Sequence, residues 1–280
     1  MKNTHNILII GQGDIGLPVT NKLAQDGLIV TGLARRERQN YALIDKARFM
    51  QADALTLTVE QLQDFTHIAI IVTPDEYSTS GYHSSYLAIN QHLALLADKL
   101  SNLQRIVFIS STGIYGQDNG EWVDQSTVPM LPRREASQVI LQAEQMLQQG
   151  FDDKAIIIRP SGIYGRERLM RVRKAKEPQK QPIAAGAWTN RIMDSDLVTV
   201  ITKVLTIEEP KPIYIATDYL PVTSFALTTW LCEQLGEALP ALDDKNTAIS
   251  GKRLHSNIPL AWLTYPDWQI GYEDILRHQD

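Results

Sequence analysis

The sequence is poor in cysteine, in long apolar runs and in charge of a single sign. Its one cysteine, Cys232, excludes an internal disulfide framework, and the helix-like run around it, FALTTWLCEQLG, favours a buried structural thiol. No run approaches the roughly 20 apolar residues of a membrane-spanning helix, and the first one, ILII, is too short for the core of a signal peptide. We therefore expect a cytoplasmic protein with no membrane partner.

The charge pattern and the histidines exclude two further classes of ligand. Lys and Arg number 27 against 32 Asp and Glu, so the formal net charge is -5, and neither end carries a tail of one sign that would favour nucleic acid. The six histidines are scattered without the spacing of metal ligands, so we expect no metal site. A chain of 280 residues is long enough for one large α/β domain, or for a main domain with a smaller appendage.

The stretch ILIIGQGDIG, residues 7–16, organises the chain. Four apolar residues run into a glycine-punctuated turn, and a helix pattern follows over residues 15–25. This is typical of a dinucleotide-binding unit: the first glycine permits the tight turn, the second lets backbone approach a pyrophosphate, and the third lets the helix pack on its strand. The predicted cofactor-binding residues here are Gly11, Gly13, Asp14, Ile15 and Gly16. The alternative is a tight strand-to-helix turn without a ligand.

The second predicted strand, residues 28–33, is followed by Ala34, Arg35 and Arg36. A unit that binds NAD usually has an acid here for the ribose 2′-hydroxyl, whereas an arginine holds the 2′-phosphate of NADP. Positions 33–36 contain no acid. We therefore expect NADP in preference to NAD, with Arg35 and Arg36 on the phosphate. The alternative is a solvated basic turn.

Alternating strand and helix patterns continue to about residue 165 and predict an α/β fold, a doubly wound parallel sheet of the NAD(P)-binding Rossmann type. Further strands are predicted near residues 49–51 and over 67–74, 105–110 and 154–159, with helices over 59–65, 86–100 and 133–149 and a loop over 75–85. The carboxyl ends of parallel strands share one edge of a sheet, where ligands bind. We expect cofactor contacts there from Thr73, Pro74 and Ser110, and from Asp53 unless it only caps a helix.

The motif GIYG occurs at residues 113–116 and again at 162–165, each time after an apolar strand. We interpret the two copies as similar glycine turns facing the ligand crevice. Beyond residue 165 the alternation loosens. We expect a dinucleotide-binding domain of residues 1–165 plus about 191–218, and a small C-terminal α+β substrate-side subdomain of residues 166–190 plus 219–280. Seven Lys or Arg stand against two Glu from Arg166 to Lys180, which predicts either a phosphate clamp or a mobile solvated connection.

Together, the glycine turn, SSTGIYG, RPSGIYG and the helix start RIMDSDL resemble the extended short-chain dehydrogenase/reductase superfamily, the NAD-dependent epimerase/dehydratase family. The resemblance covers nearly the whole chain. It implies that Ser111, with Thr112 beside it, lies in the active site, and that a YxxxK helix follows with the tyrosine as general acid/base. Anchoring on Ala143-Glu144, which ends the helix signature, puts Ala136 and Ile140 at the tyrosine and lysine positions.

The missing YxxxK, the GxGxxG spacing and the stretch PRR before AEQML resemble the atypical, YeeZ-like subgroup, which keeps the cofactor fold. If catalysis persists, another group must replace the tyrosine. Glu135 precedes the vacated position and acts as an acid/base if desolvated; the alternative is a helix-dipole role. The resemblance implies that Tyr115 and Tyr164 pack in the core, and we expect Asp196 to be a helix cap.

We therefore expect an atypical NAD(P)-dependent oxidoreductase or epimerase-like enzyme without the usual Tyr-Lys pair, with Ser111, Thr112 and Glu135 as catalytic candidates. Its substrate is expected to be a small carbonyl, sugar or nucleotide-sugar compound, one that bears phosphate if the basic segment is a clamp. The protein is expected to be a monomer or a homodimer. The alternative is a non-catalytic NAD(P)-binding sensor or partner-binding module.

Overall fold

The structure is a computed structural model that describes residues 5–36, 44, 46–177 and 181–278. Contacts divide the chain into two compact units. The first unit comprises Met1–Ile114, Leu131–Arg159 and Val198–Tyr214, and the second comprises Tyr115–Met130, Pro160–Leu197 and Ile215–Asp280. Residues 115–130, expected in the dinucleotide-binding domain, belong to the second unit, where a strand within them pairs with residues 253–254.

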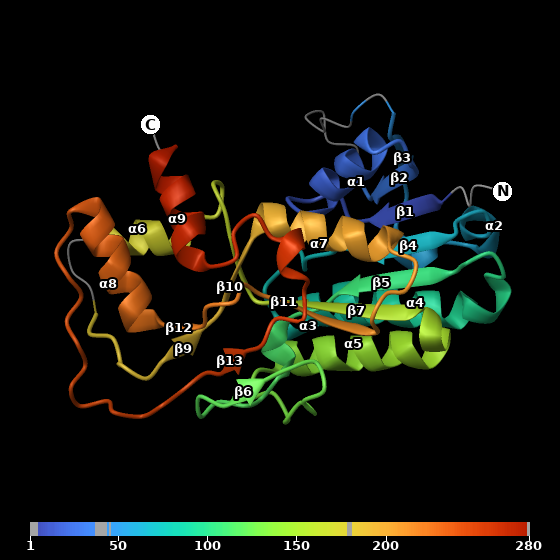
Figure 1. The fold of residues 1–280 in the computed structure, drawn as a ribbon. Helices are drawn as coiled ribbons and strands as arrows, with labels where there is room; N and C mark the ends of the chain where they lie inside the picture. Colours follow the sequence, from blue (N-terminus) through green and yellow to red (C-terminus); the bar gives the residue numbers. More distant parts are fainter. Residues whose placement is uncertain (1–4, 37–43, 45, 178–180, 279–280) are drawn as a thin grey trace. The chain divides into compact units, whose positions relative to one another are not determined.

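The first unit is built on a seven-stranded parallel sheet in the order β11-β7-β5-β4-β1-β2-β3 (Figure 1). Its strands are β1 (Asn6–Ile10), β2 (Ile29–Ala34), β3 (Arg48–Gln51), β4 (His67–Ile70), β5 (Arg105–Ile109), β7 (Ala155–Pro160) and β11 (Ile213–Ala216). The chain builds outward from β1 through β2 to β3, and then returns to place β4 on the other side of β1. This confirms the predicted doubly wound sheet, whose switch point lies between β1 and β4.

The central strands are apolar because both faces of the sheet are covered. Every residue of β4, β5 and β7 is buried, which is typical of a parallel sheet flanked by helices. The helices that lie in the first unit or extend into it are α1 (Gly16–Gln25), α2 (Val59–Leu62), α3 (Thr79–Tyr82), α4 (Ala88–Leu96), α5 (Glu135–Phe151) and α7 (Asp194–Thr206). None of the helices in the described ranges has the length and apolar character needed to span a membrane.

The connection after β4 differs from the prediction of a loop over residues 75–85. The strand ends at Ile70, and α3 begins at Thr79 with Ser78 as its cap, since Ser78 Oγ accepts a hydrogen bond from the Gly81 N–H at 3.1 Å. A π-helical turn over His83–Leu87 then leads into α4. The serines that suggested a loop therefore include a helix N-cap.

Among its described residues, the second unit contains two-stranded pairs and short helices, and it also holds the start of α7. The pairs are β8 (Gly162–Tyr164) with β10 (Arg191–Met193), β9 (Trp188–Thr189) with β12 (Val222–Thr223), and β6 (Trp122–Val123) with β13 (Arg253–Leu254); the helices are α6 (Met170–Ala175), α8 (Ser224–Leu235) and α9 (Trp268–Arg277). The interpretation of the two GIYG copies as similar turns is wrong. The first contains a 3₁₀ turn, Thr112–Ile114, whereas the second enters β8 because β10 offers it a pairing partner.

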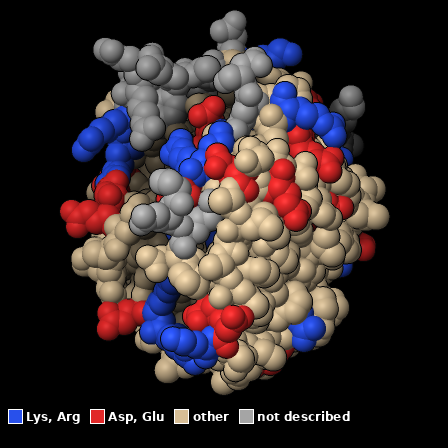
Figure 2. Space-filling view, turned by 90° about the vertical axis from the view of Figure 1, so that its left-hand side faces the viewer, with Lys and Arg blue, Asp and Glu red and all other residues tan. Residues whose placement is uncertain are grey.

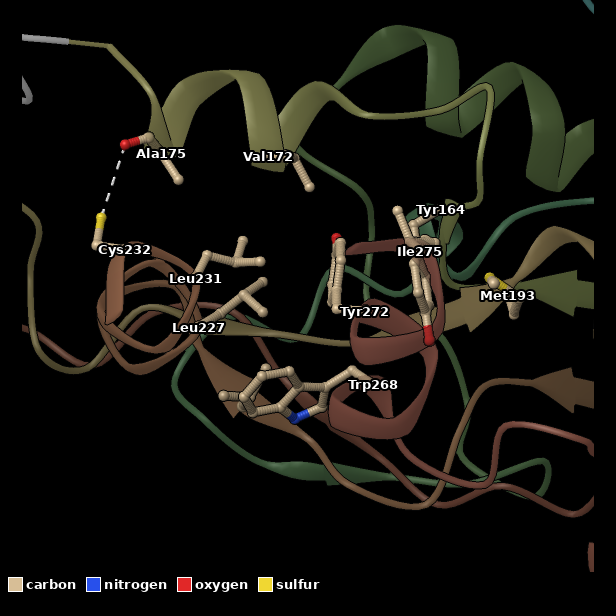
Figure 3. Packing of buried hydrophobic residues seen from close by; sticks show 11 residues of the cluster. Tyr164, Val172, Ala175, Met193, Leu227, Leu231, Cys232, Trp268, Tyr272 and Ile275 are labelled. Carbon is tan, nitrogen blue, oxygen red and sulfur yellow. Dashed lines mark hydrogen bonds between the residues drawn. The ribbon is translucent and has the colours of Figure 1, made fainter. Parts of the chain in front are cut away.

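The core of the second unit joins α6, α8 and α9 (Figure 3). Tyr164 stacks on Tyr272 with ring centroids 4.5 Å apart, which confirms a packing role for this tyrosine. Cys232 is fully buried on α8, and its thiol donates to the Ala175 carbonyl oxygen at 3.8 Å, as expected for a structural thiol. Val172 and Ala175 belong to the same core, so this part of the basic segment is a packed helix and not a mobile connection.

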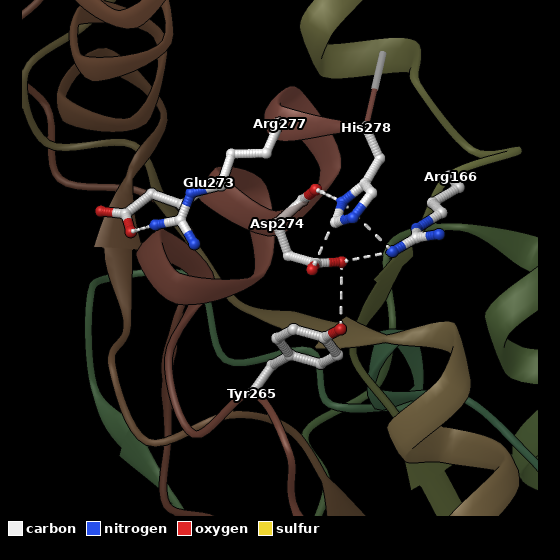
Figure 4. A network of polar contacts seen from close by, with 6 residues as sticks. All are labelled: Arg166, Tyr265, Glu273, Asp274, Arg277 and His278. Atoms are coloured by element: carbon white, nitrogen blue, oxygen red, sulfur yellow. Dashed lines mark hydrogen bonds and ion pairs between the residues drawn. The ribbon is translucent and has the colours of Figure 1, made fainter. Parts of the chain in front are cut away.

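Polar contacts hold the end of α9 against the residue that follows the second GIYG (Figure 4). Asp274 Oδ2 accepts hydrogen bonds from Arg166 Nη2 at 3.0 Å and from Tyr265 Oη at 3.1 Å. The contact with Arg166 lowers the pKa of the Asp274 carboxyl more than the other contacts do. Arg166 is therefore already paired within the second unit.

A buried histidine lies at the amino-terminal end of β4. His67 is 1% exposed, and its Nδ1 lies 2.9 Å from Thr66 Oγ1. Burial lowers the pKa of its imidazole to about 3, with smaller contributions from the charges of His5 and Arg105. The folded protein therefore keeps this ring neutral over most of the acidic range.

We predict that the buried His67 lowers the free energy of unfolding as the solution becomes acidic. Its pKa is about 3 when folded and 6.5 in a free chain, so between these values only the unfolded chain takes up the proton. The contribution of the neutral His67 ring to the free energy of unfolding is complete above pH 6.5. It is lost as the pH falls towards 3, at about 1.4 kcal/mol per pH unit. The free energy of unfolding, measured by urea titration between pH 7 and 5, should change less steeply with pH in His67→Gln than in the wild type. The exposed-residue control, His83→Gln, should keep the wild-type slope, and equal slopes for all three proteins would contradict the prediction.

Candidate functional site

Two of the three glycines in GQGDIG are required by the fold itself. Gly11 has φ +96°, and a Cβ there would lie 2.1 Å from the Ile71 carbonyl oxygen. A Cβ on Gly16 would lie 1.9 Å from the Gly11 carbonyl oxygen. Both distances are far shorter than van der Waals contact, so only glycine allows β1, α1 and the end of β4 to approach this closely.

Gly13 is different. A Cβ on this residue would have no atom within 4 Å, its φ is not positive, and the residue is exposed. The protein's own packing would therefore accept a larger side chain here. A glycine in open space beside a helix start is what close approach of a pyrophosphate requires.

The start of α1 leaves its backbone N–H groups without a side-chain cap. Ile15 is the N-cap residue and makes no side-chain hydrogen bond, and the first turn contains no acid. Asp14 is exposed just before the helix, while Ile15 and Gly16 are buried. The Leu17 N–H bonds the Gly13 carbonyl oxygen at 3.1 Å and Pro18 has no N–H, so the positive end of the helix dipole can hold an anion through the N–H groups that precede Leu17.

A buried glutamine holds this turn in place. Gln12 is 3% exposed, and its Nε2 donates to the Ile9 carbonyl oxygen at 3.1 Å and to Thr20 Oγ1 at 3.0 Å. A Cβ on Gly32 of β2 would lie 2.6 Å from the Gln12 amide. The sequence analysis did not identify Gln12, although a glycine inside β2 indicates close approach by another group.

The arginine expected to bind a 2′-phosphate is paired with an acid. Arg35 Nη2 lies 2.6 Å from Asp75 Oδ1 and 2.7 Å from Oδ2, and the two side chains are 58% and 70% exposed. The hydrogen bond between them is the largest cause that raises the pKa of Arg35 and lowers that of Asp75. Arg36 is exposed, and its charge also lowers the pKa of Asp75. The sequence analysis did not identify Asp75 as a site residue.

The other residues expected near the cofactor are placed as follows. Asp53 caps the 3₁₀ turn Ala54–Thr56, with Oδ1 accepting from the Leu55 N–H at 2.9 Å, so the capping alternative describes it. Thr73 is exposed and Pro74 is buried, both after β4. They remain candidate wall residues at the carboxyl edge of the sheet.

Ser110, which directly follows β5, is bonded to a buried ion pair. Ser110 Oγ donates to Glu144 Oε1. Arg159 binds the same carboxylate with two bonds, Nε to Oε1 at 3.0 Å and Nη2 to Oε2 at 2.6 Å. Glu144 is 1% exposed and Arg159 is 4% exposed. This contact fixes α5 against the ends of β5 and β7, and the sequence analysis used Glu144 only to set the register of the helix.

The catalytic candidates divide into two places on the first unit. Ser111 Oγ accepts from the Gly113 N–H at 3.0 Å, and Thr112 is buried in the same turn. A Cβ on Gly113 would lie 3.1 Å from Ser111 Oγ and 3.2 Å from Ser137 Oγ, so these two hydroxyls flank one glycine. Glu135 instead accepts from Thr79 Oγ1 at 2.9 Å. Ser137 was missed, although it follows the expected tyrosine position.

Ala136 and Ile140 lie on α5, where the resemblance placed a tyrosine and a lysine. Ile140 is 5% exposed and packs in the core, and Ala136 is partly exposed. Neither side chain titrates or donates a proton. Any proton transfer near Ser111 must therefore involve hydroxyl groups, other neighbouring residues or water.

The second unit holds an unusual set of buried polar atoms. Arg191 is 7% exposed, and its Nη1 donates to the Asn190 carbonyl oxygen at 3.1 Å. Within the described residues, Arg191 Nε and Nη2 and the hydroxyls of Tyr164 and Tyr272 have no hydrogen-bond partner. Burial raises the pKa of Asp218 to about 8, so this nearby acid is largely protonated at neutral pH. A buried arginine without full compensation favours an anionic ligand.

The face drawn in Figure 2 does not show the basic field that a phosphate clamp in the basic segment would predict. On that face, the basic and acidic side chains of the described residues are interspersed and form no single basic field.

Asp196 is 1% exposed, and its oxygens accept from the N–H groups of Thr264 and Tyr265, both at 2.9 Å. The expectation that it caps its own helix is wrong, because it binds a distant loop. Among the described residues, no group of three or more His, Cys, Asp or Glu is arranged to hold a metal ion.

Comparison with known proteins gives one family. The NAD dependent epimerase/dehydratase family matches residues 7–204. Among curated proteins, none matches the sequence. Among solved structures, a provisionally named NAD-dependent epimerase/dehydratase from Methylobacillus flagellatus is 30% identical, with a TM-score of 0.77 and 98% of each chain covered.

More distant structures share the fold. UDP-glucuronic acid 4-epimerase from Bacillus cereus, solved with NAD, is 16% identical, with a TM-score of 0.74 over 98% of this chain and 100% of the other. The Bordetella bronchiseptica enzyme WbmG, solved with NAD and UDP, is 13% identical, with a TM-score of 0.76 over 99% of this chain and 96% of the other.

We predict that Glu144 stabilises the first unit mainly by compensating Arg159. The Glu144→Gln variant should lose about 3–5 kcal/mol of unfolding free energy in urea titration, because it leaves a buried charge without its partner. The double variant Glu144→Met, Arg159→Met removes both charges and should recover most of the loss. An exposed pair, Glu273 with Arg277 at 3.0 Å, provides the control, since Glu273→Gln should cost less than about 0.5 kcal/mol. A Glu144→Gln loss no larger than the control's would contradict this account.

Proposed function

Because the chain belongs to the NAD-dependent epimerase/dehydratase family, we propose that it is an NAD(P)-binding oxidoreductase or epimerase acting on a small carbonyl, sugar or nucleotide-sugar compound. The observation that carries the proposal is Gly13, a glycine that the protein's own packing does not require. Its open position beside the uncapped start of α1 fits a pyrophosphate group.

The residues of the first unit have distinct proposed roles. Gly13 and the first backbone N–H groups of α1 hold the pyrophosphate, and the nicotinamide ring, when bound, supplies hydride transfer. Ser111 lies at the carboxyl end of β5, on the same edge of the sheet as the glycine turn. Its Oγ accepts from the Gly113 N–H and keeps its own proton to donate to a substrate oxygen, with Ser137 as the neighbouring hydroxyl.

A non-catalytic nucleotide-binding sensor is the second candidate, and Ala136 with Ile140 is the observation that favours it. A panel of carbonyl compounds and UDP-sugars, tested with NAD, NADH, NADP and NADPH, separates the two functions. Turnover that is lost in Ser111→Ala supports the enzyme. Cofactor binding without turnover of any panel member supports the sensor.

On the substrate side, we infer that the second unit binds the phosphate groups of a nucleotide-type substrate. Arg191 supports this inference, because two of its buried nitrogen atoms have no partner within the described residues. The charge of Arg171 further lowers the pKa of Arg191, after burial, so two guanidinium groups lie near one another. Solved structures with this fold carry UDP or UDP-glucuronic acid.

We predict that Gly13→Val weakens cofactor binding and leaves the unfolding temperature unchanged. The variant should unfold at the wild-type temperature, because a Cβ at Gly13 has no protein atom within 4 Å. It should bind NAD and NADP at least about tenfold more weakly in calorimetry, because the side chain occupies the place of the pyrophosphate. Gly11→Ala should instead lower the unfolding temperature, because its Cβ meets the Ile71 carbonyl. Unchanged cofactor affinity in folded Gly13→Val, or no binding of any of the four cofactors to wild type at millimolar concentration, would rule out this role.

We predict that Arg191→Met weakens UDP binding at least about tenfold without changing NAD affinity, because methionine keeps the volume but removes the charge. The control is Lys174→Met, which removes an exposed charge from the basic segment and should leave both affinities unchanged. Equal losses in the two variants would indicate a general effect of the basic segment, and no loss in Arg191→Met would remove Arg191 from the binding site.

A further inference from the structure

We propose that Asp75 determines which dinucleotide the chain accepts, by holding Arg35 across the carboxyl end of β1 and placing a carboxylate beside the adenosine ribose. The proposal rests on the dinucleotide binding argued above and identifies a specificity residue for it. The observation that carries it is the contact of Arg35 Nη2 with both Asp75 oxygens, at 2.6 and 2.7 Å.

The sheet order places this contact over the cofactor turn. Arg35 directly follows β2, and Asp75 follows β4 by five residues. In the sheet, β1 lies between these strands and pairs with both. A side-chain contact from the end of β2 to the segment after β4 therefore crosses the end of β1, where GQGDIG begins. This is the switch point at which a dinucleotide binds in such sheets.

The contact supplies the acid that the end of β2 lacks. In dinucleotide-binding units, an acid at this position accepts a hydrogen bond from the ribose 2′-hydroxyl. Residues 33–36 are Leu, Ala, Arg and Arg, but Asp75 brings a carboxylate to the same place from another strand. A ribose hydroxyl donates to that carboxylate, whereas a 2′-phosphate meets a like charge there and competes with it for Arg35.

The strength of the contact suits a selective role and not a structural one. Both side chains are more than half exposed, and ion pairs of this kind contribute little to stability. A ligand can therefore rearrange the contact at a small cost in free energy. The negative charge of Asp75 still repels a phosphate at this position. Arg36, exposed on the adjacent position, is the further cation that a phosphate would meet once Arg35 is released.

The test measures dissociation constants of NAD and NADP by calorimetry for the full chain. Asp75→Asn should raise the affinity for NADP relative to NAD by about tenfold or more, because it removes the negative charge and releases Arg35. In the double variant Asp75→Asn, Arg35→Met this gain should become several-fold smaller, because the phosphate loses the cation that Asp75→Asn releases and only the relief of the like charge remains. Glu76→Gln is the matched control, since it removes an adjacent exposed carboxylate and should leave the ratio unchanged.

The outcomes separate this inference from the proposed function. An NADP-to-NAD ratio in Asp75→Asn within twofold of wild type, with both cofactors bound, overturns the role of Asp75 alone. A gain of undiminished size without Arg35 overturns the mechanism, because it shows that the carboxylate acts without the arginine. No binding of either cofactor to wild type at millimolar concentration overturns the dinucleotide-binding function and this inference together. Unfolding temperatures of all variants should match wild type, since the changed side chains are exposed.

Discussion

The first unit depends on the close approach of three backbone segments at one point. The Gly11 carbonyl faces the Cα of Gly16, and Gly11 itself lies against the Ile71 carbonyl, with distances that allow no side chain. This contact joins β1, α1 and the end of β4, and it creates the switch point of the sheet. Gln12 adds a side-chain link, because its Nε2 donates to Thr20 Oγ1 of α1. The Gln12 amide fits there because Gly32 has no side chain. The position of Gly13 at the surface follows from these contacts, and so does the direction of the α1 amide groups.

A second constraint fixes the serines relative to α5. The buried carboxylate of Glu144 is shared by Arg159 and Ser110, so the helix cannot slide along β5 and β7 without leaving two charges or a hydroxyl unpaired in the interior. The same helix carries Ala136, Ser137 and Ile140. Its register is thus set by an ion pair, and the hydroxyl beside Ser111 comes from Ser137 because of that register. The anchoring uses neither Ala136 nor Ile140, so it does not depend on a titrating pair at these two positions.

The sequence predicted the features that depend on local patterns. Apolar runs located the strands of the sheet, the glycine spacing located its switch point, and alternation predicted the doubly wound order. Contacts between residues far apart in the chain could not be read in this way. Asp75 lies 40 positions from Arg35, Asp196 binds a loop 68 positions away, and the second GIYG becomes a strand only because β10 pairs with it. The helix start at Ser78 was missed because a serine cap and a serine-rich loop have the same composition.

The two units differ in how completely their buried polar groups are satisfied. In the first, the guanidinium groups of Arg159 and Arg105 donate to carboxylate or carbonyl oxygens, and the Glu144 carboxylate accepts from Arg159 and Ser110. The second unit holds most of the buried polar atoms that have no hydrogen-bond partner among the described residues, including those of Arg191 and Tyr272. Asp218, with a pKa of about 8, does not neutralise Arg191 at neutral pH and does so only as the pH rises above that value. A buried cation left in this state costs free energy unless an anion joins it, and this cost is the physical ground for the phosphate-binding role proposed for the second unit.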